Sequence, residues 1–255
     1  MKKLLLLTSF LILSIGIFSQ GKKNNLHIIF IGNSISEGSL LENPKQEAAP
    51  VKASEYLEKQ DKVENLKYIN CGKSGATTVD FLPASENLFV NVKKAADELY
   101  DKNSSLIFSI MLGTNDSAEK GPNGSPISPP QYYTNMKVIM DELHSLYPSA
   151  IFVLHHPIWY SPNTHNGSVY LQAGLNRLQS YYPVIDKLVS DYAATQPNMV
   201  YKGDTDGFEY FKKNYEAEFT HENGHAGPFF LHPNKNGAAK LGEFWGKAIY
   251  DILFR

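Results

Sequence analysis

The sequence predicts an α/β protein, a three-layer α/β/α sandwich around a mainly parallel central sheet of about five strands. Three observations lead to this fold class. Short apolar runs rich in β-branched residues alternate along the chain with longer segments of helical periodicity. Turn residues follow two of these runs directly, at Gly32 and Gly113. The 255 residues, 42% hydrophobic and 20% charged, suffice for one domain with a sizeable core.

The first half of the chain contains three predicted strands and two predicted helices. Residues 26–31 form a short apolar run typical of a buried strand, and Gly32 ends it. Pro50 suits the first turn of a helix, which is expected over residues 49–60. Further strands are predicted at 66–70 and 105–112, on either side of a helix at 86–100 that carries an apolar stripe.

The second half continues the alternation. A helix is predicted at 131–146, with Pro148 just beyond its end, and a fourth strand at 150–154. Residues 170–194 are expected to form one bent helix or two, because Pro183 interrupts the pattern. A short fifth strand at 199–201 and a helix at 235–253 complete the chain. In a parallel sheet of this kind, the loops after the strands gather at one edge and form the site.

Residues 1–20 have the features of a secretory signal peptide. A basic start at Lys2 and Lys3 precedes an apolar stretch, and small residues follow it. The apolar stretch is shorter than the roughly 20 residues that span a bilayer. We therefore expect cleavage, export to the periplasm or the medium, no stable membrane insertion afterwards, and a single domain at residues 21–255.

Charge and cysteine content exclude several classes of protein. Lys and Arg number 24 against 26 Asp and Glu, a formal net charge of −2, so no basic face for nucleic acid is expected. Cys71 is the one cysteine, which rules out an intrachain disulfide. Nothing in the sequence indicates an oligomeric state.

Four short segments carry the chemistry. In chain order they are 32–36 (GNSIS), 74–77 (SGAT), 113–116 (GTND) and 232–234 (HPN). Each alone is ordinary turn chemistry. Serine is a poor nucleophile at neutral pH, so acyl transfer needs a histidine to take its proton and fixed donors to hold the oxyanion. Together the four segments could supply all of these groups.

With these segments the chain, from residue 28 to about residue 253, resembles the GDSL/SGNH hydrolase family. The resemblance implies a flavodoxin-like α/β/α fold and an esterase that needs no cofactor. By the same resemblance, Ser34 would be the nucleophile and His232 the general base. The oxyanion would be held by the backbone N–H groups of Ser34 and Gly75 and by the Asn115 amide.

Two positions depart from the family pattern. Asn33 stands where the family usually has Asp beside the serine, and Phe229 stands three residues before the histidine, where the family commonly has the triad Asp. An imidazole base needs its other nitrogen hydrogen-bonded to hold the correct tautomer. Phe229 cannot accept that hydrogen bond. Its partner could be a backbone carbonyl or an acid elsewhere in the sequence, or the site could work as a bare Ser-His dyad. The candidate acids are Glu222 first, then Asp206 or Asp204.

Other residues are candidates for substrate or metal contact. His156, Trp159 and Tyr160 follow the fourth predicted strand, where an exposed aromatic ring would suit stacking on a sugar. The alternative is that Trp159 and Tyr160 belong to the core. His221 and His225 resemble half of a metal site. No carboxylate and cysteine arrangement around them has a recognised ligand spacing, so no metal is predicted.

The sequence therefore predicts a serine esterase acting through an acyl-enzyme on a small-molecule or glycan ester. Similarity to bacterial carbohydrate O-acetylesterases, an analogy within the family, favours O-acetyl groups on a carbohydrate. The alternatives are a lysophospholipase, a short-chain lipase or thioesterase of the same family, and a catalytically silent carbohydrate-binding relative.

Overall fold

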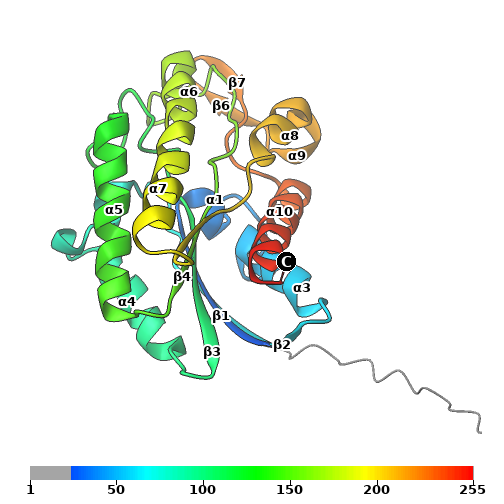
Figure 1. Ribbon diagram of the computed structural model, residues 1–255. Coiled ribbons are helices and arrows are strands. Elements are labelled where there is room, and N and C mark those ends of the chain that lie inside the picture. Colours follow the sequence, from blue (N-terminus) through cyan, green and yellow to red (C-terminus); the bar gives the residue numbers. More distant parts are fainter. Residues whose placement is uncertain (1–23, 255) are drawn as a thin grey trace, which may run out of the picture.

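Five parallel strands form the central sheet of the computed structural model, which describes residues 24–254 (Figure 1). The signal peptide predicted at residues 1–20 lies outside the described residues. The strand order is β2-β1-β3-β4-β5. The bounds are β1 Asn24–Gly32, β2 Val63–Asn70, β3 Ser104–Met111, β4 Ile151–Leu154 and β5 Val200–Lys202. The predicted fold class is confirmed, and each predicted strand overlaps an observed one.

Helices cover both faces of the sheet (Figure 1). On one face lie α3 (Ala49–Glu58) and α10 (Lys235–Phe254); on the other lie α4 (Leu88–Leu99), α5 (Pro129–Leu146) and α7 (Tyr182–Thr195). Residues 170–194, predicted as one bent helix or two, form two helices. The first, α6 (Leu171–Ser180), ends before Tyr181, and Pro183 lies in the first turn of α7.

Side chains of the central strands are buried on both faces of the sheet. In β1, Ile29 and Ile31 pack into the core under α4, α5 and α7, whereas Ile28 and Phe30 pack under α3 and α10. Phe30 stacks on Trp245 of α10 at a centroid distance of 6.1 Å. A strand buried on both faces has no polar positions to alternate with, which explains its continuous apolar run.

Short elements at the carboxyl end of the sheet did not show in the sequence pattern. They are helices α1 (Ser34–Glu37), α2 (Pro44–Glu47), α8 (Gly207–Lys213) and α9 (Tyr215–Glu218), two 3₁₀ turns (Thr78–Phe81 and Pro83–Ser85), and the hairpin of β6 (Glu222–Gly224) and β7 (Gly227–Phe229). Elements of three to seven residues are too short to display a period. In Figure 1 the hairpin and α8–α9 lie at the end of the sheet from which α1 starts.

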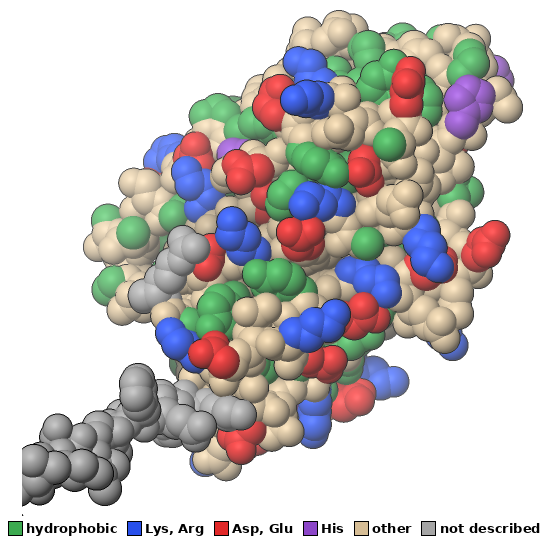
Figure 2. Space-filling view, turned by 90° about the vertical axis from the view of Figure 1, so that its right-hand side faces the viewer, with side chains coloured by type: hydrophobic (Ala, Val, Ile, Leu, Met, Phe, Trp, Pro, Cys, Tyr) green, Lys and Arg blue, Asp and Glu red, His purple; other side chains and the backbone are tan. Residues whose placement is uncertain are grey.

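The face formed by α3, α8, α9 and α10 carries interspersed cations and anions rather than charge of one sign (Figure 2). Several form local ion pairs, including Lys240–Glu243 at 2.9 Å and Lys52–Glu55 at 3.1 Å. None of the helices within residues 24–254 combines the length and the apolar character that crossing a bilayer requires.

Candidate active site

Ser34 lies at the junction of β1 and α1. Asn33 caps the helix, because its Oδ1 accepts the N–H of Ile35 at 3.0 Å. Gly32 makes the tight turn possible: a Cβ at this position would approach Ser36 Oγ to 2.0 Å. Ser34 is 7% exposed, and within residues 24–254 its N–H donates no hydrogen bond. The turn therefore presents a serine hydroxyl and a free N–H together.

His232 faces Ser34 across the carboxyl end of the sheet. Its Nε2 lies 3.0 Å from Ser34 Oγ. On the other side of the ring, Nδ1 lies 3.0 and 3.1 Å from the two carboxylate oxygens of Glu222, and Glu222 Oε1 also accepts the His232 N–H at 3.1 Å. A carboxylate only accepts, so Nδ1 carries the proton and Nε2 is free to take one from the serine.

The hairpin explains why the acid stands at Glu222. β6 and β7 pair antiparallel, with Glu222 directly opposite Phe229. Opposite residues of an antiparallel pair project from the same face, with Cβ atoms about 5 Å apart. Phe229, at the position where the family pattern has Asp, is buried at 1% exposure, and Glu222 supplies the carboxylate from the neighbouring strand. Backbone hydrogen bonding from Thr220 N–H to the His232 carbonyl at 2.9 Å joins the two segments.

The other candidate acids do not contact His232. Asp204 follows β5, and its carboxylate accepts the N–H groups of Asp206 and Gly207 at the start of α8. Asp206 is exposed at the same helix end. Both carboxyls belong to this helix terminus, so Glu222 is the acid that the structure places on the imidazole.

The Asn115 amide and the Gly75 backbone lie side by side, after β3 and β2. Asn115 Nδ2 donates to the carbonyl of Ala76 at 2.8 Å, which leaves one amide hydrogen free, and Asn115 Oδ1 accepts the Tyr170 hydroxyl at 2.7 Å. Gly75 adopts a left-handed backbone with φ of +79°, and its N–H donates to no group in residues 24–254. Because β1, β2 and β3 are neighbours, the three proposed donors share one edge of the sheet.

Side chains of α1 and of the residues after β3 hold the Gly75 loop in place. Glu37 Oε2 accepts the N–H of Ser74 at 2.6 Å. Asp116 is fully buried, and its Oδ1 accepts the Thr78 N–H at 2.9 Å and the Thr78 hydroxyl at 2.5 Å. Burial raises the pKa of Asp116 to about 6. The acid beside Asn115 is therefore a structural tie between two loops.

The structure buries the three candidates for substrate contact after β4. Trp159 is 7% exposed, Tyr160 0% and His156 8%. Trp159 packs on Tyr215 of α9, Tyr160 packs on Tyr170, and His156 stacks on Tyr182 of α7 at 4.3 Å. These contacts favour the alternative that the rings belong to the core. Residues that come later in the chain cover Trp159 and Tyr160, and the local sequence pattern does not show such long-range contacts.

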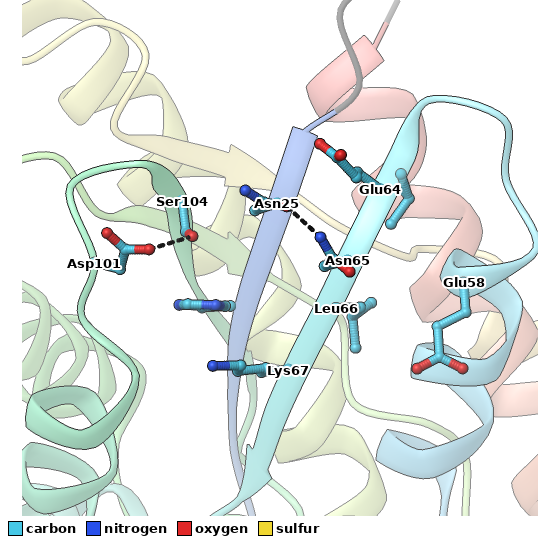
Figure 3. Close-up of a pocket in the computed structure, with 10 residues that line it drawn as sticks. Asn25, Glu58, Glu64, Asn65, Leu66, Lys67, Asp101 and Ser104 are labelled. Atoms are coloured by element: carbon cyan, nitrogen blue, oxygen red, sulfur yellow. Dashed lines mark hydrogen bonds between the residues drawn. The ribbon is translucent and has the colours of Figure 1, made fainter.

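The described residues contain no metal-ligand cluster, and a cavity lies away from the Ser34 site. Within residues 24–254, no three His, Cys, Asp or Glu side chains gather closely enough to hold a metal ion. A cavity of about 480 Å³ lies at the opposite end of the sheet, where β1 and β2 begin (Figure 3). Asn65 donates to Asn25 across it at 3.0 Å, and His27 bonds the Leu99 carbonyl. Its histidine is therefore engaged in the fold.

Sequence reasoning missed Tyr170. It directly precedes α6 and has no motif around it, so its contact with Asn115 arises from the fold alone.

The chain was compared with known proteins. A family model described as GDSL-like Lipase/Acylhydrolase matches residues 28–245. A search of curated protein sequences found no match. The native aryl esterase of M. smegmatis superposes with a TM-score of 0.59 at 14% identity, over 89% of this chain and 99% of that one. A carbohydrate acetylesterase from Sinorhizobium meliloti gives a TM-score of 0.58 at 14% identity over the same shares. A two-domain esterase active on acetylated mannans gives 0.56 at 17% identity, over 91% of this chain and 50% of that one. At these identities the superpositions establish the fold.

Proposed function

Because this chain belongs to the GDSL-like lipase/acylhydrolase family, we propose that it hydrolyses O-acetyl esters of a carbohydrate through an acyl-enzyme on Ser34. The observation that carries the mechanism is the hydrogen-bonded line from Ser34 Oγ through His232 to Glu222, with contacts of 3.0 Å on each side of the imidazole. Nucleophile, base and orienting acid in that order form the arrangement that activates a serine hydroxyl.

Acylation begins when Ser34 Oγ attacks the ester carbonyl carbon and its proton passes to His232 Nε2. Glu222 stabilises the imidazolium that forms. The negative charge on the former carbonyl oxygen is held by the N–H groups of Ser34 and Gly75 and by the free amide hydrogen of Asn115. Collapse of this intermediate breaks the bond to the sugar oxygen, which leaves with the proton from His232.

Deacylation repeats these steps with water. His232 takes a proton from the water molecule, the resulting hydroxide attacks the acyl carbon, and the same donors hold the oxyanion. The bond to Ser34 Oγ then breaks, and the serine recovers the proton from His232. The products are the free carboxylic acid, the alcohol and the starting enzyme.

The choice of a carbohydrate acetyl ester draws support from two fold relatives, a carbohydrate acetylesterase and an esterase active on acetylated mannans. Export is part of the same proposal and rests on the signal-peptide features of residues 1–20. An exported enzyme reaches extracellular or periplasmic glycans. A lysophospholipase or short-chain lipase is the rival, and it predicts activity that rises with acyl length.

Three measurements test the proposal: turnover of a nitrophenyl ester series from acetyl to octanoyl, acetate release from acetylated mannan and xylan, and labelling by a fluorophosphonate. We expect acetyl preference and a single labelled residue. Ser34→Ala should abolish both turnover and labelling, whereas Ser149→Ala, an exposed serine before β4, should change neither. Wild-type protein that binds acetylated glycan without turnover or labelling would be a silent binding relative, and the proposal would fail.

A further inference from the structure

The irregular segment 161–170, which connects β4 to α6, is bound on two sides. On one side Val169 N–H donates to the Lys120 carbonyl at 2.6 Å, a few residues after Asn115. On the other side the Asn163 amide donates to the Pro228 carbonyl at 2.5 Å, and His225 N–H donates to the His165 carbonyl at 2.7 Å. The segment therefore joins the loop that carries Asn115 to the hairpin that carries Glu222.

Tyr170 is the last residue of this segment, and its hydroxyl contacts the side chain of Asn115, one of the proposed oxyanion donors. Its ring is 3% exposed and packs edge-on against Tyr160 at 5.3 Å, and its hydroxyl donates to Asn115 Oδ1 at 2.7 Å. Burial raises the pKa of Tyr170 to about 12, so the phenol remains a donor.

The two partners of the Asn115 amide select the same orientation. The Tyr170 hydroxyl donates to the oxygen, and the Ala76 carbonyl accepts from the nitrogen at 2.8 Å. A flipped amide would place its oxygen 2.8 Å from the Ala76 carbonyl oxygen and would present no hydrogen to the oxyanion. Without the phenol, the Ala76 contact is the one hydrogen bond within residues 24–254 that still fixes the amide orientation.

We propose that Tyr170 is a positioning residue that holds the Asn115 amide in the orientation that donates to the oxyanion. This inference rests on the proposed function of the site. It predicts an effect on the transition state rather than on substrate binding, because the oxyanion exists only after the serine attacks. Loss of the hydroxyl should therefore lower kcat and leave KM within about twofold.

Tyr170→Phe removes one oxygen atom and keeps the ring. We expect kcat to fall about 5- to 30-fold, less than the roughly 100- to 1000-fold expected for complete loss of the donor in Asn115→Ala. Tyr160→Phe is the matched control. It removes a hydroxyl from the neighbouring buried ring, where the partner is Ser117 Oγ at 2.9 Å and not Asn115. Its kcat should stay within about twofold of wild type.

A double-mutant cycle separates positioning from general loss of structure. In the Asn115→Ala background, Tyr170→Phe should cost less than about twofold, because no amide is left to orient. Rates are expressed per site titrated with a fluorophosphonate, so that partly folded preparations do not distort kcat.

Equal losses in Tyr170→Phe and Tyr160→Phe, or an undiminished Tyr170→Phe effect in the Asn115→Ala background, would overturn this inference while the proposed function stands. A wild-type protein that hydrolyses no ester would overturn the proposed function, and this inference with it.

Discussion

Glu222→Gln is the most direct test of the proposed catalytic line. The substitution keeps the size of the side chain and an oxygen that can accept the His232 N–H, which Glu222 Oε1 now accepts at 3.1 Å, and it removes the negative charge beside Nδ1. The side chains of His232 and Glu222 are 12% and 14% exposed, so solvent does not replace the lost carboxylate freely.

The size of the effect follows from the geometry. A carboxylate 3.0 Å from the imidazolium that forms in the transition state attracts it by about 5 kcal/mol at an effective dielectric constant near 20. At about 1.4 kcal/mol per factor of ten, loss of this attraction lowers kcat roughly 10³- to 10⁴-fold. KM should change little, since the positive charge is absent from the ground state.

The assay is turnover of nitrophenyl acetate by wild type, Glu222→Gln and Ser34→Ala at one pH. Glu216→Gln is the matched control, because Glu216 is an exposed carboxylate in the neighbouring α9 that contacts the Tyr215 hydroxyl. Asp206→Asn tests the rival acid. A Glu222→Gln enzyme within tenfold of wild type would show that a Ser-His dyad suffices, and a larger loss in Asp206→Asn would contradict the geometry.

Two further predictions concern the loops around the site. A Cβ at Gly72 would lie 2.6 Å from the Glu37 backbone nitrogen, so Gly72→Ala should push α1 away from the Gly75 loop. We expect a lower kcat and a loss of about 1–3 kcal/mol in the free energy of unfolding, measured by denaturant titration. Gly167→Ala, with no atom within 4 Å of the new Cβ, is its control, and equal stability of the two variants would contradict the packing argument. Burial raises the pKa of Asp116 from 3.8 to about 6, so its contribution to stability is complete below pH 4 and is lost as the pH rises through 6. Asp116→Asn should remove roughly 2 kcal/mol of this decline in urea unfolding between pH 4 and 7, and unchanged pH dependence would refute the assignment.

The sequence predicted the sheet and the long helices well, because their periods are local. β1 and β3 contain continuous apolar runs, at residues 28–31 and 106–108, and α4 and α5 carry apolar stripes, so each could be recognised without its neighbours. Pro183 indicated an interruption within residues 170–194, and the structure has two helices with the break just before this proline.

The site was harder, because its parts depend on how distant segments meet. Ser34 and His232 could be found from motifs, and Glu222 was the first of three candidate acids, beside the possibility of a bare Ser-His dyad. For Trp159 and Tyr160 the sequence left a surface and a core position open, because the rings that cover them, Tyr215 and Tyr170, come later in the chain. Only a contact between residues 55 positions apart identifies Tyr170.

The register of the β6–β7 ribbon, with Glu222 opposite Phe229, has a consequence for recognising relatives. A carboxylate can move to a different sequence position and still hydrogen-bond the same histidine, provided that the old and new positions lie opposite each other in one antiparallel strand pair. A search pattern that demands an acid at a fixed spacing before the histidine would class such chains as inactive. One that accepts an acid on either arm of the ribbon would retain them.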